Sequence, residues 1–211
     1  MRKYILFLTG LILFASCEKE ENLSILPLCD DEYYYYSVGS IHYFKHSLNE
    51  IWIEFKQDDV TGEMAKSLLE KYSFINTDNF SADNYYERFK AIINKDCNCT
   101  DFKNHLKELN KDSEIVSATP VFYTSENDPM SYAILLSEVI TEYKEGVISE
   151  PEFINYAEGL NLELIESHYF QYFRVRKVET GFEALEIANQ VYESGMVKYA
   201  NANYIQNRTL H

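Results

Sequence analysis

The sequence lacks the motifs on which the common hydrolases and nucleotide-dependent enzymes rely. It has no Gly-x-Ser-x-Gly elbow, no His-Glu-x-x-His pair and no glycine-rich loop of the kind that cradles phosphate. Its histidines are scattered, and His42 and His46 lie in an aromatic, strand-like region rather than on one face of a helix. We therefore predict that the chain is not an enzyme and that it holds no metal and no cofactor.

Basic residues are also few. Lys and Arg number 19 against 34 Asp and Glu, which gives a formal net charge of −15 at pH 7. A field of this sign repels nucleic acid and anionic lipid, so we expect no nucleic-acid partner. The 18 Tyr and 13 Phe argue against disorder and indicate sheets with aromatic faces.

The one run with the character of a targeting segment is short and stands at the N-terminus. Arg2 and Lys3 precede an apolar run, Tyr4–Phe14, which is too short for a comfortable membrane span. Residues 1–16 therefore read as a signal peptide. The order Phe14-Ala15-Ser16-Cys17 resembles a bacterial lipobox, which implies palmitate and other acyl chains on Cys17 as a membrane anchor. The alternative is a plain signal peptide with a cysteine after its cleavage site.

The residues after Cys17 are acidic. Glu18, Lys19, Glu20 and Glu21 resemble the surface-export signal of lipoproteins from the Bacteroides group, and they fit a solvated tether equally well. We expect residues 17–32 to be a lipidated tether. The protein is then anchored by lipid to the outer membrane of the cell envelope, and it is exposed at the surface if the acidic run is an export signal.

Cysteine is sparse, with four residues in all. If Cys17 carries lipid, then Cys29, Cys97 and Cys99 remain, an odd number in an oxidising compartment. We expect Cys29 to form a disulfide with either Cys97 or Cys99. A metal or redox role for the Cys97–Cys99 pair has no second pair and no histidine cluster to support it.

The chain contains an internal repeat. Ile51–Lys56 aligns with Val139–Lys144, and the match extends without a gap to Phe74 and Leu162. In each copy an apolar strand is followed by a short turn and an amphipathic helix. Ser149 and Glu152 have the spacing of a capping box at the start of the second copy's helix.

The later parts of the two copies also correspond. Residues 100–102 match 180–182, where each copy opens a second helix, and residues 115–120 match 197–202 as the last strands. Thr180 and Glu183 form a second expected capping box. Each copy therefore predicts the order strand–helix–strand–strand–helix–strand.

This order predicts an α+β protein built from two tandem ferredoxin-like (βαββαβ) units with antiparallel sheets. We place the first unit at residues 33–125, the second at 130–206 and a C-terminal tail at 207–211. Right-handed crossovers would put the helices of a unit on one face of its sheet. In the first unit, Tyr33–Tyr36 and Ile41–Phe44 are expected to form a hairpin.

The second copy resembles a known family. Three stretches, Phe182–Ala188, Tyr192–Gly195 and Val197–Tyr204, are similar to the N-terminal prodomain of subtilisin-like serine proteases, of the fervidolysin type. Ala202 stands where that family usually has proline, and Pro120 occupies the place in the first copy. We expect no catalytic domain of such a protease in this protein.

The resemblance implies a protein-binding module that inhibits a subtilisin-like protease or assists its folding. In that family the sheet packs on the protease, a carboxylate in the turn between the second and third strands caps an enzyme helix, and the C-terminal tail enters the active-site cleft. The corresponding residues here are Glu166, Tyr204, Ile205, Gln206, Asn207, Arg208, Thr209, Leu210 and His211. The alternative is a non-catalytic envelope lipoprotein that binds another protein, or the remnant of a split protease gene.

Overall fold

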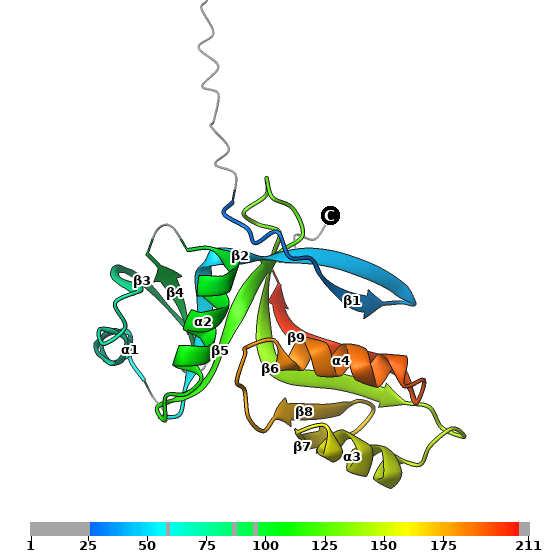
Figure 1. Ribbon diagram of the computed structural model, residues 1–211. Helices are drawn as coiled ribbons and strands as arrows, with labels where there is room; N and C mark the ends of the chain where they lie inside the picture. The colour runs from blue at the N-terminus through cyan, green and yellow to red at the C-terminus, as the bar shows by residue number, and fades with distance from the viewer. Residues whose placement is uncertain (1–25, 58–59, 86–87, 95–96, 207–211) are drawn as a thin grey trace, which may run out of the picture.

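The computed structural model describes residues 26–57, 60–85, 88–94 and 97–206, and within them it is mixed α+β with nine strands and four helices (Figure 1). The predicted signal peptide, Cys17 and the acidic run lie outside the described residues. In chain order the elements are β1 (Tyr33–Ser37), β2 (Ser40–Phe55), α1 (Gly62–Leu69), β3 (Ile75–Tyr85), β4 (Arg88–Ile93), α2 (Cys99–Leu109), β5 (Ile115–Tyr123), β6 (Tyr132–Tyr143), α3 (Glu150–Gly159), β7 (Leu162–Ser167), β8 (Gln171–Val175), α4 (Glu183–Glu193) and β9 (Val197–Gln206).

All nine strands belong to one antiparallel sheet. In the first half the strand order is β3-β4-β2-β5, and in the second half β7-β8-β6 is followed by β9 on the far edge of β6. The halves join where the end of β5 pairs with the start of β6, with Val121 opposite Ile134. The two halves therefore share one sheet as well as one order of elements.

The sequence begins the helices in the expected places. Thr61 caps α1 by accepting the backbone N–H of Met64, and Ser149 with Glu152 forms the predicted capping box of α3. The starts of the other two helices differ slightly from expectation. The side chain of Asn98 caps α2, and the N-cap of α4 is Phe182 rather than Thr180.

The helices of both halves pack into one continuous core. Phe102 and Leu106 from α2, Phe153 from α3, and Leu185 and Ala188 from α4 all belong to the same cluster of buried residues. A helix hides its apolar stripe only against another apolar surface, so each helix covers the same side of the shared sheet. The opposite side is covered differently in the two halves.

In the middle of the sheet, the N-terminal segment covers the side that faces away from the helices. Trp52, Val121 and Ile134 form a second small cluster there, with Leu26 and Leu28 packed against it. The segment is held by a bridge between Leu28 and Ser47. Residues 26–32, which the sequence assigns to the tether, therefore lie on the body of the protein.

Strand β2 is one strand of 16 residues, whereas the sequence suggests separate strands at residues 41–44 and 51–56. Its first part pairs with β1, and its second part pairs with β4 and β5. A register shift between His46 and Ile51 lets the one strand bend between these partners. The β1–β2 hairpin is thus a continuation of the first half's central strand.

The β1–β2 hairpin crosses to the second half. The ring of Tyr33 stacks on Phe182 at 4.8 Å, and the ring of Tyr36 stacks on Tyr192 at 4.3 Å. The side chain of Asn189 donates a hydrogen bond to the carbonyl oxygen of Tyr34 at 2.8 Å. Figure 1 shows the hairpin lying along α4. It therefore ties α4 to the first half.

Gly181, in the loop before α4, lies directly against the first half. Its φ is +85°, and a Cβ at this position would lie 2.5 Å from the backbone oxygen of Ala118 in β5. Any side chain here would collide with backbone, so the loop before α4 can rest against β5 only because residue 181 is glycine.

Candidate functional site

Within the part of the second half that the structure describes, no helix covers the side of the sheet that faces away from the core. We call this side the open face. One row of directly opposed residues crosses four strands here, because Glu166 pairs with Tyr172, Tyr172 with Ile140 and Ile140 with Asn201. Opposed residues point to the same side of a sheet. Ile140 and Tyr172 are half-buried and belong to neither cluster of core residues.

The charged groups beside this row neutralise one another. The guanidinium of Arg174 lies 3.6 Å from the carboxylate of Glu138, which also accepts a hydrogen bond from the side chain of Asn203 at 2.8 Å. On the other side of the row, the ammonium of Lys198 lies 2.8 Å from the carboxylate of Glu142. In a chain with a large negative charge, the open face is thus an apolar and aromatic strip between paired charges.

Aromatic and aliphatic side chains extend the open face at the β7–β8 turn. The ring of Phe170 lies 6.0 Å from that of Tyr199, and Tyr169 and Ile165 are 73% and 53% exposed. Glu166 lies at the end of β7 with its carboxylate 3.0 Å from Nε2 of His168, and both side chains are largely exposed. Glu166 is therefore free to meet a partner at the edge of this surface.

Residues Tyr204–Gln206 are not a free tail. They form the end of β9 and pair with Leu135, Ile134 and Ala133 of β6. The Tyr204 ring lies 6.0 Å from Tyr35 of the hairpin, and burial raises the pKa of its hydroxyl well above the ordinary value. A tail that could enter a cleft therefore starts after Gln206. The remaining predicted tail residues, Asn207, Arg208, Thr209, Leu210 and His211, lie outside the described residues.

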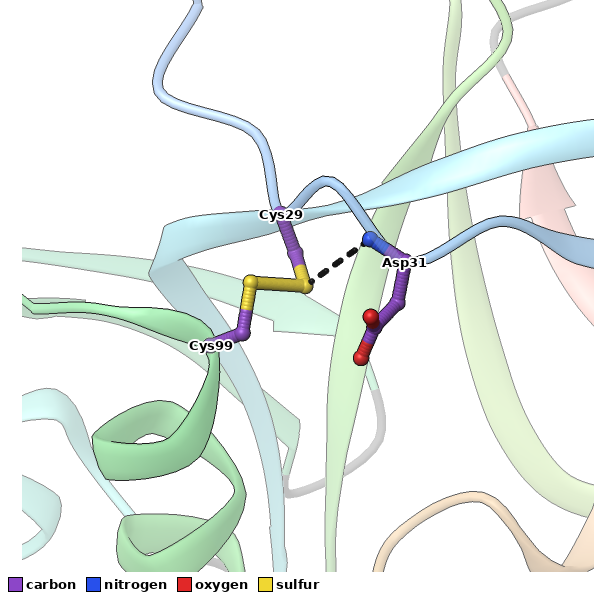
Figure 2. Close-up of side chains that lie close together, drawn as sticks. All are labelled: Cys29, Asp31 and Cys99. Atoms are coloured by element: carbon purple, nitrogen blue, oxygen red, sulfur yellow. Dashed lines mark hydrogen bonds between the residues drawn. A yellow bond between two sulfur atoms is a disulfide. The ribbon is translucent and has the colours of Figure 1, made fainter.

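The predicted disulfide joins Cys29 to Cys99 (Figure 2). It fixes the N-terminal segment to the first turn of α2, and the backbone N–H of Asp31 points at the Cys29 sulfur at 3.4 Å. Cys97, the other expected partner, is a free thiol whose pKa is raised to about 11, chiefly by burial. Within the described residues, the only cluster with the spacing of metal ligands is Cys29, Asp31 and Cys99, and its two sulfurs are bonded to each other.

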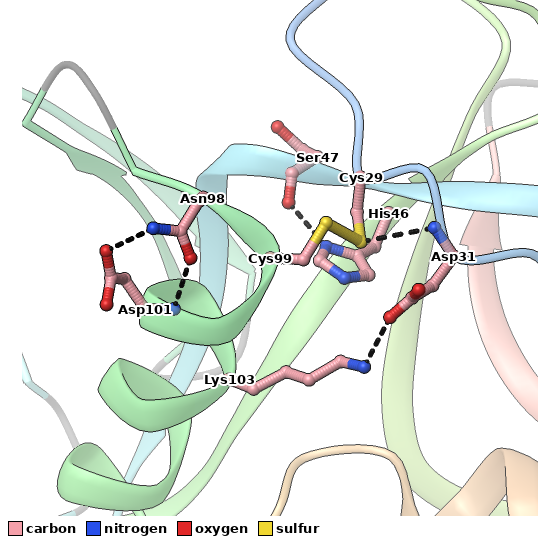
Figure 3. A network of polar contacts seen from close by, with 8 residues as sticks. All are labelled: Cys29, Asp31, His46, Ser47, Asn98, Cys99, Asp101 and Lys103. Carbon is pink, nitrogen blue, oxygen red and sulfur yellow. Dashed lines mark hydrogen bonds and ion pairs between the residues drawn. A yellow bond between two sulfur atoms is a disulfide. The ribbon is translucent and has the colours of Figure 1, made fainter.

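A buried histidine lies directly beneath the disulfide (Figure 3). His46 is fully buried, its ring stacks on Phe102 at 4.5 Å, and Phe182 approaches it at 5.6 Å from the second half. Nδ1 lies 2.7 Å from the carbonyl oxygen of Ser47, and Nε2 has no hydrogen-bond partner. Nδ1 therefore carries the proton and donates it to that carbonyl.

Burial opposes the cation of His46 more strongly than the Ser47 carbonyl and the Asp31 carboxylate favour it. Burial lowers the pKa of the ring to about 4, and the nearby ammonium of Lys103 acts in the same direction. Lys103 pairs with the carboxylate of Asp31 at 2.6 Å, which holds the pKa of Asp31 below its usual value (Figure 3). His46 is thus a neutral core residue at the junction of α2, the hairpin and α4.

Sequence reasoning did not identify the residues that form the open face, apart from Glu166. The sequence could have placed Arg174 on the side of the sheet away from the core, because Phe173 and Val175 alternate with Arg174 and Arg176 along β8. For Tyr172 and Ile140 the pattern gives no such signal, since their position on the open face depends on the register between strands.

Comparison with known proteins gives no match to a protein-family model, to a curated protein or to a solved structure. Among the described residues, none of the helices is both long and apolar enough to cross a membrane.

Proposed function

We propose that the protein is a lipid-anchored envelope lipoprotein whose second half is a protease-binding module of the prodomain type. In this proposal each half is a ferredoxin-like unit. The order β3-β4-β2-β5 in the first half and the same order in the second support it, since a ferredoxin-like sheet places its third strand between its second and first.

The observation that carries the proposal is the open face. A sheet side without a helix cover, with Ile140 and Tyr172 at its centre and paired charges around them, has the composition of a protein-binding surface. Glu166 lies at one edge of it, at the end of β7 just before the turn whose carboxylate the prodomain resemblance assigns to a helix N-terminus of the enzyme.

Binding would then have three parts. The open face packs against the catalytic domain, the Glu166 carboxylate accepts backbone N–H groups at the start of an enzyme helix, and residues 207–211 add a strand in the active-site cleft. The halves share one core, so the first half supports the module through β5, β6 and the hairpin rather than acting as a separate domain.

The test uses the mature chain from residue 18 onward and a panel of subtilisin-like proteases with a peptide substrate. We expect inhibition at micromolar concentration or below, and an increased yield when a denatured protease refolds in its presence if the chain assists folding. Truncation after Gln206 leaves β9 intact and should weaken inhibition at least tenfold.

Two matched pairs of variants test the surface. Tyr172→Ala on the open face should weaken inhibition, whereas Tyr156→Ala on α3 should not, because Tyr156 packs on the helical side. Glu166→Gln should weaken it more than Glu158→Gln, whose carboxylate faces Arg176. No effect on any protease, or equal inhibition by the intact and truncated chains, would reject the prodomain mechanism and leave an envelope lipoprotein with a different protein partner.

The anchor is tested separately. Replacing Cys17 with Ala should move the protein from the membrane to the soluble fraction, since the acyl chains supply the membrane affinity. A variant that stays with membranes as strongly as the wild type would show that Cys17 is not the attachment point.

A further inference from the structure

The tip of the β1–β2 hairpin is an exposed apolar projection on a highly charged protein. Val38 is fully exposed, Ile41 is 46% exposed and Tyr43 is 59% exposed. From Tyr33 to Phe44 the chain contains no Asp, Glu, Lys or Arg, although a quarter of all its residues are charged. We call the exposed side chains Val38, Ile41 and Tyr43 the hairpin tip.

The backbone conformation at the turn of the hairpin is unfavourable for Val38. Val38 has φ +49° and Gly39 has φ +78°, the pattern of a two-residue turn that favours Asn-Gly. A β-branched residue pays a steric penalty at positive φ, and a fully exposed valine gains no packing in return. Neither local backbone preference nor packing therefore accounts for a valine in this turn.

The two sides of the hairpin have different roles. Tyr33, Tyr35 and Phe44 point inward and pack with the core. Tyr34 is paired with Tyr43 and Tyr36 with Ile41, so these four point to the other side. Two of them are anchored, because the hydroxyls of Tyr34 and Tyr36 donate to the Glu193 carboxylate at 3.1 and 2.9 Å.

The position of the hairpin relative to the chain start suggests what it contacts. Figure 1 shows the first described residues near the base of the hairpin, on the same side of the molecule as the hairpin. From Cys17 to Leu26 the chain can span at most about 30 Å when fully extended. A lipid on Cys17 would therefore hold this side close to the bilayer surface.

We propose that the hairpin tip contacts the lipid surface, with Val38 and Ile41 in the interfacial region and the ring of Tyr43 at the level of the headgroups. This proposal rests on the proposed lipid anchor but not on protease binding. Tyrosine suits such a position because its ring is apolar and its hydroxyl is polar. The lipid is zwitterionic, since the acidic body would be repelled by an anionic surface.

The experiment places a fluorescent reporter at the tip. The only tryptophan of the chain, Trp52, is 4% exposed, so its emission is a constant background. Val38→Trp is introduced into the chain from residue 18 onward, carrying an N-terminal hexahistidine that attaches it to phosphatidylcholine vesicles containing a nickel-chelating lipid. Tyr169→Trp, on the exposed β7–β8 turn, is the matched control.

We expect the emission of the Val38→Trp chain to shift to the blue on vesicles, and its quenching by iodide to fall several-fold, while the Tyr169→Trp chain changes in neither respect. No change for Val38→Trp, or equal changes for both variants, would overturn the proposal. A blue shift that appears without vesicles as the protein concentration rises would also overturn it, because a second copy of the chain would then cover the tip.

A second variant separates stability from contact. Val38→Asn relieves the strained turn, so it should raise the midpoint of thermal unfolding, and it should weaken partitioning of the untagged chain into phosphatidylcholine vesicles several-fold. Partitioning equal to that of the wild type would count against a lipid role for Val38. The vesicle tag replaces the natural anchor and no protease is present, so failure here is distinguishable from failure of the Cys17 or protease tests.

Discussion

The buried ring of His46 predicts a loss of stability in mild acid. The pKa of this ring is lowered from 6.5 to about 4 in the folded protein, chiefly by burial. Between these two pH values the unfolded chain binds a proton that the folded chain does not. His46 therefore contributes stability that is fully present above pH 6.5 and is lost as the pH falls toward 4.

The magnitude follows from the shift. Lowering the pKa of the ring from 6.5 to about 4 corresponds to about 3 kcal/mol of folding free energy, at about 1.36 kcal/mol per pKa unit. The ring is fully buried, so solvent does not screen this contribution. Asp31 titrates below this window, since its pKa is held under the usual 3.8 by Lys103. His105 acts in the same direction as His46, because burial against Phe74 lowers its pKa.

The assay is urea unfolding at several pH values from 7.5 to 4, followed by the fluorescence of Trp52. The wild type is compared with His46→Asn, which keeps a donor for the Ser47 carbonyl but cannot titrate. The variant is less stable at every pH because it loses the stacking on Phe102, and its stability should fall by about 3 kcal/mol less than that of the wild type across the window. His105→Asn should keep most of the wild-type slope. If His46→Asn shows the same pH dependence as the wild type, the account of a neutral, buried His46 is refuted.

Three further predictions concern Gly181, the start of α4 and the disulfide. Gly181→Ala should destabilise the protein by about 2–4 kcal/mol in urea unfolding, because the new Cβ meets the Ala118 backbone. The control is Gly195→Ala, at a similar φ but in open space, which should cost about 1 kcal/mol. Equal losses would contradict the close approach of Gly181 to Ala118. Glu183→Ala should cost about 1–2 kcal/mol, because its carboxylate accepts the backbone N–H groups of residues 179, 180 and 181, and Glu186→Ala in the same helix turn is the control. Cys29→Ala should cost about 4 kcal/mol, since the disulfide closes a separation of 70 residues. Cys97→Ala should leave the stability within about 0.5 kcal/mol and should remove the only thiol that reacts in the unfolded mature chain. A free Cys99 in peptide mapping would contradict the assigned pairing.

The sequence predicts what depends on neighbours along the chain. The capping box of Ser149 and Glu152 is present, and so is the hairpin at residues 33–44. Glu183 also interacts with Thr180 as its spacing suggests, yet Phe182 is the N-cap, because the Glu183 carboxylate also takes the N–H groups of the residues before the helix. Such features are set within four residues or within a short turn, so their signal is visible in the sequence.

Contacts between distant residues could not be predicted in the same way. The hairpin touches α4 through residues about 155 positions apart, as in the hydrogen bond from Asn189 to Tyr34. The choice of Cys99 over Cys97 depends on where α2 begins, and its cap, Asn98, puts Cys99 in the first turn. The open face depends on strand register, which a shift of one residue would invert. Candidate binding residues such as Tyr172 are therefore visible only in the folded chain.

The two proposed surfaces do not compete for the same part of the molecule. The hairpin packs with the helical side through Tyr33 and Tyr36, and it borders the open face only at its β9 edge, where the side chain of Asn201 donates to the carbonyl oxygen of Tyr36 at 3.4 Å. The open face, with Ile140 and Tyr172, lies on the opposite side. Contact of the hairpin tip with lipid would add a second attachment to the proposed lipid anchor and restrict how the body can rotate. It would do so while leaving the open face and Glu166 accessible to a protein partner, and the Val38→Asn variant should accordingly lose vesicle contact without losing protease inhibition in solution.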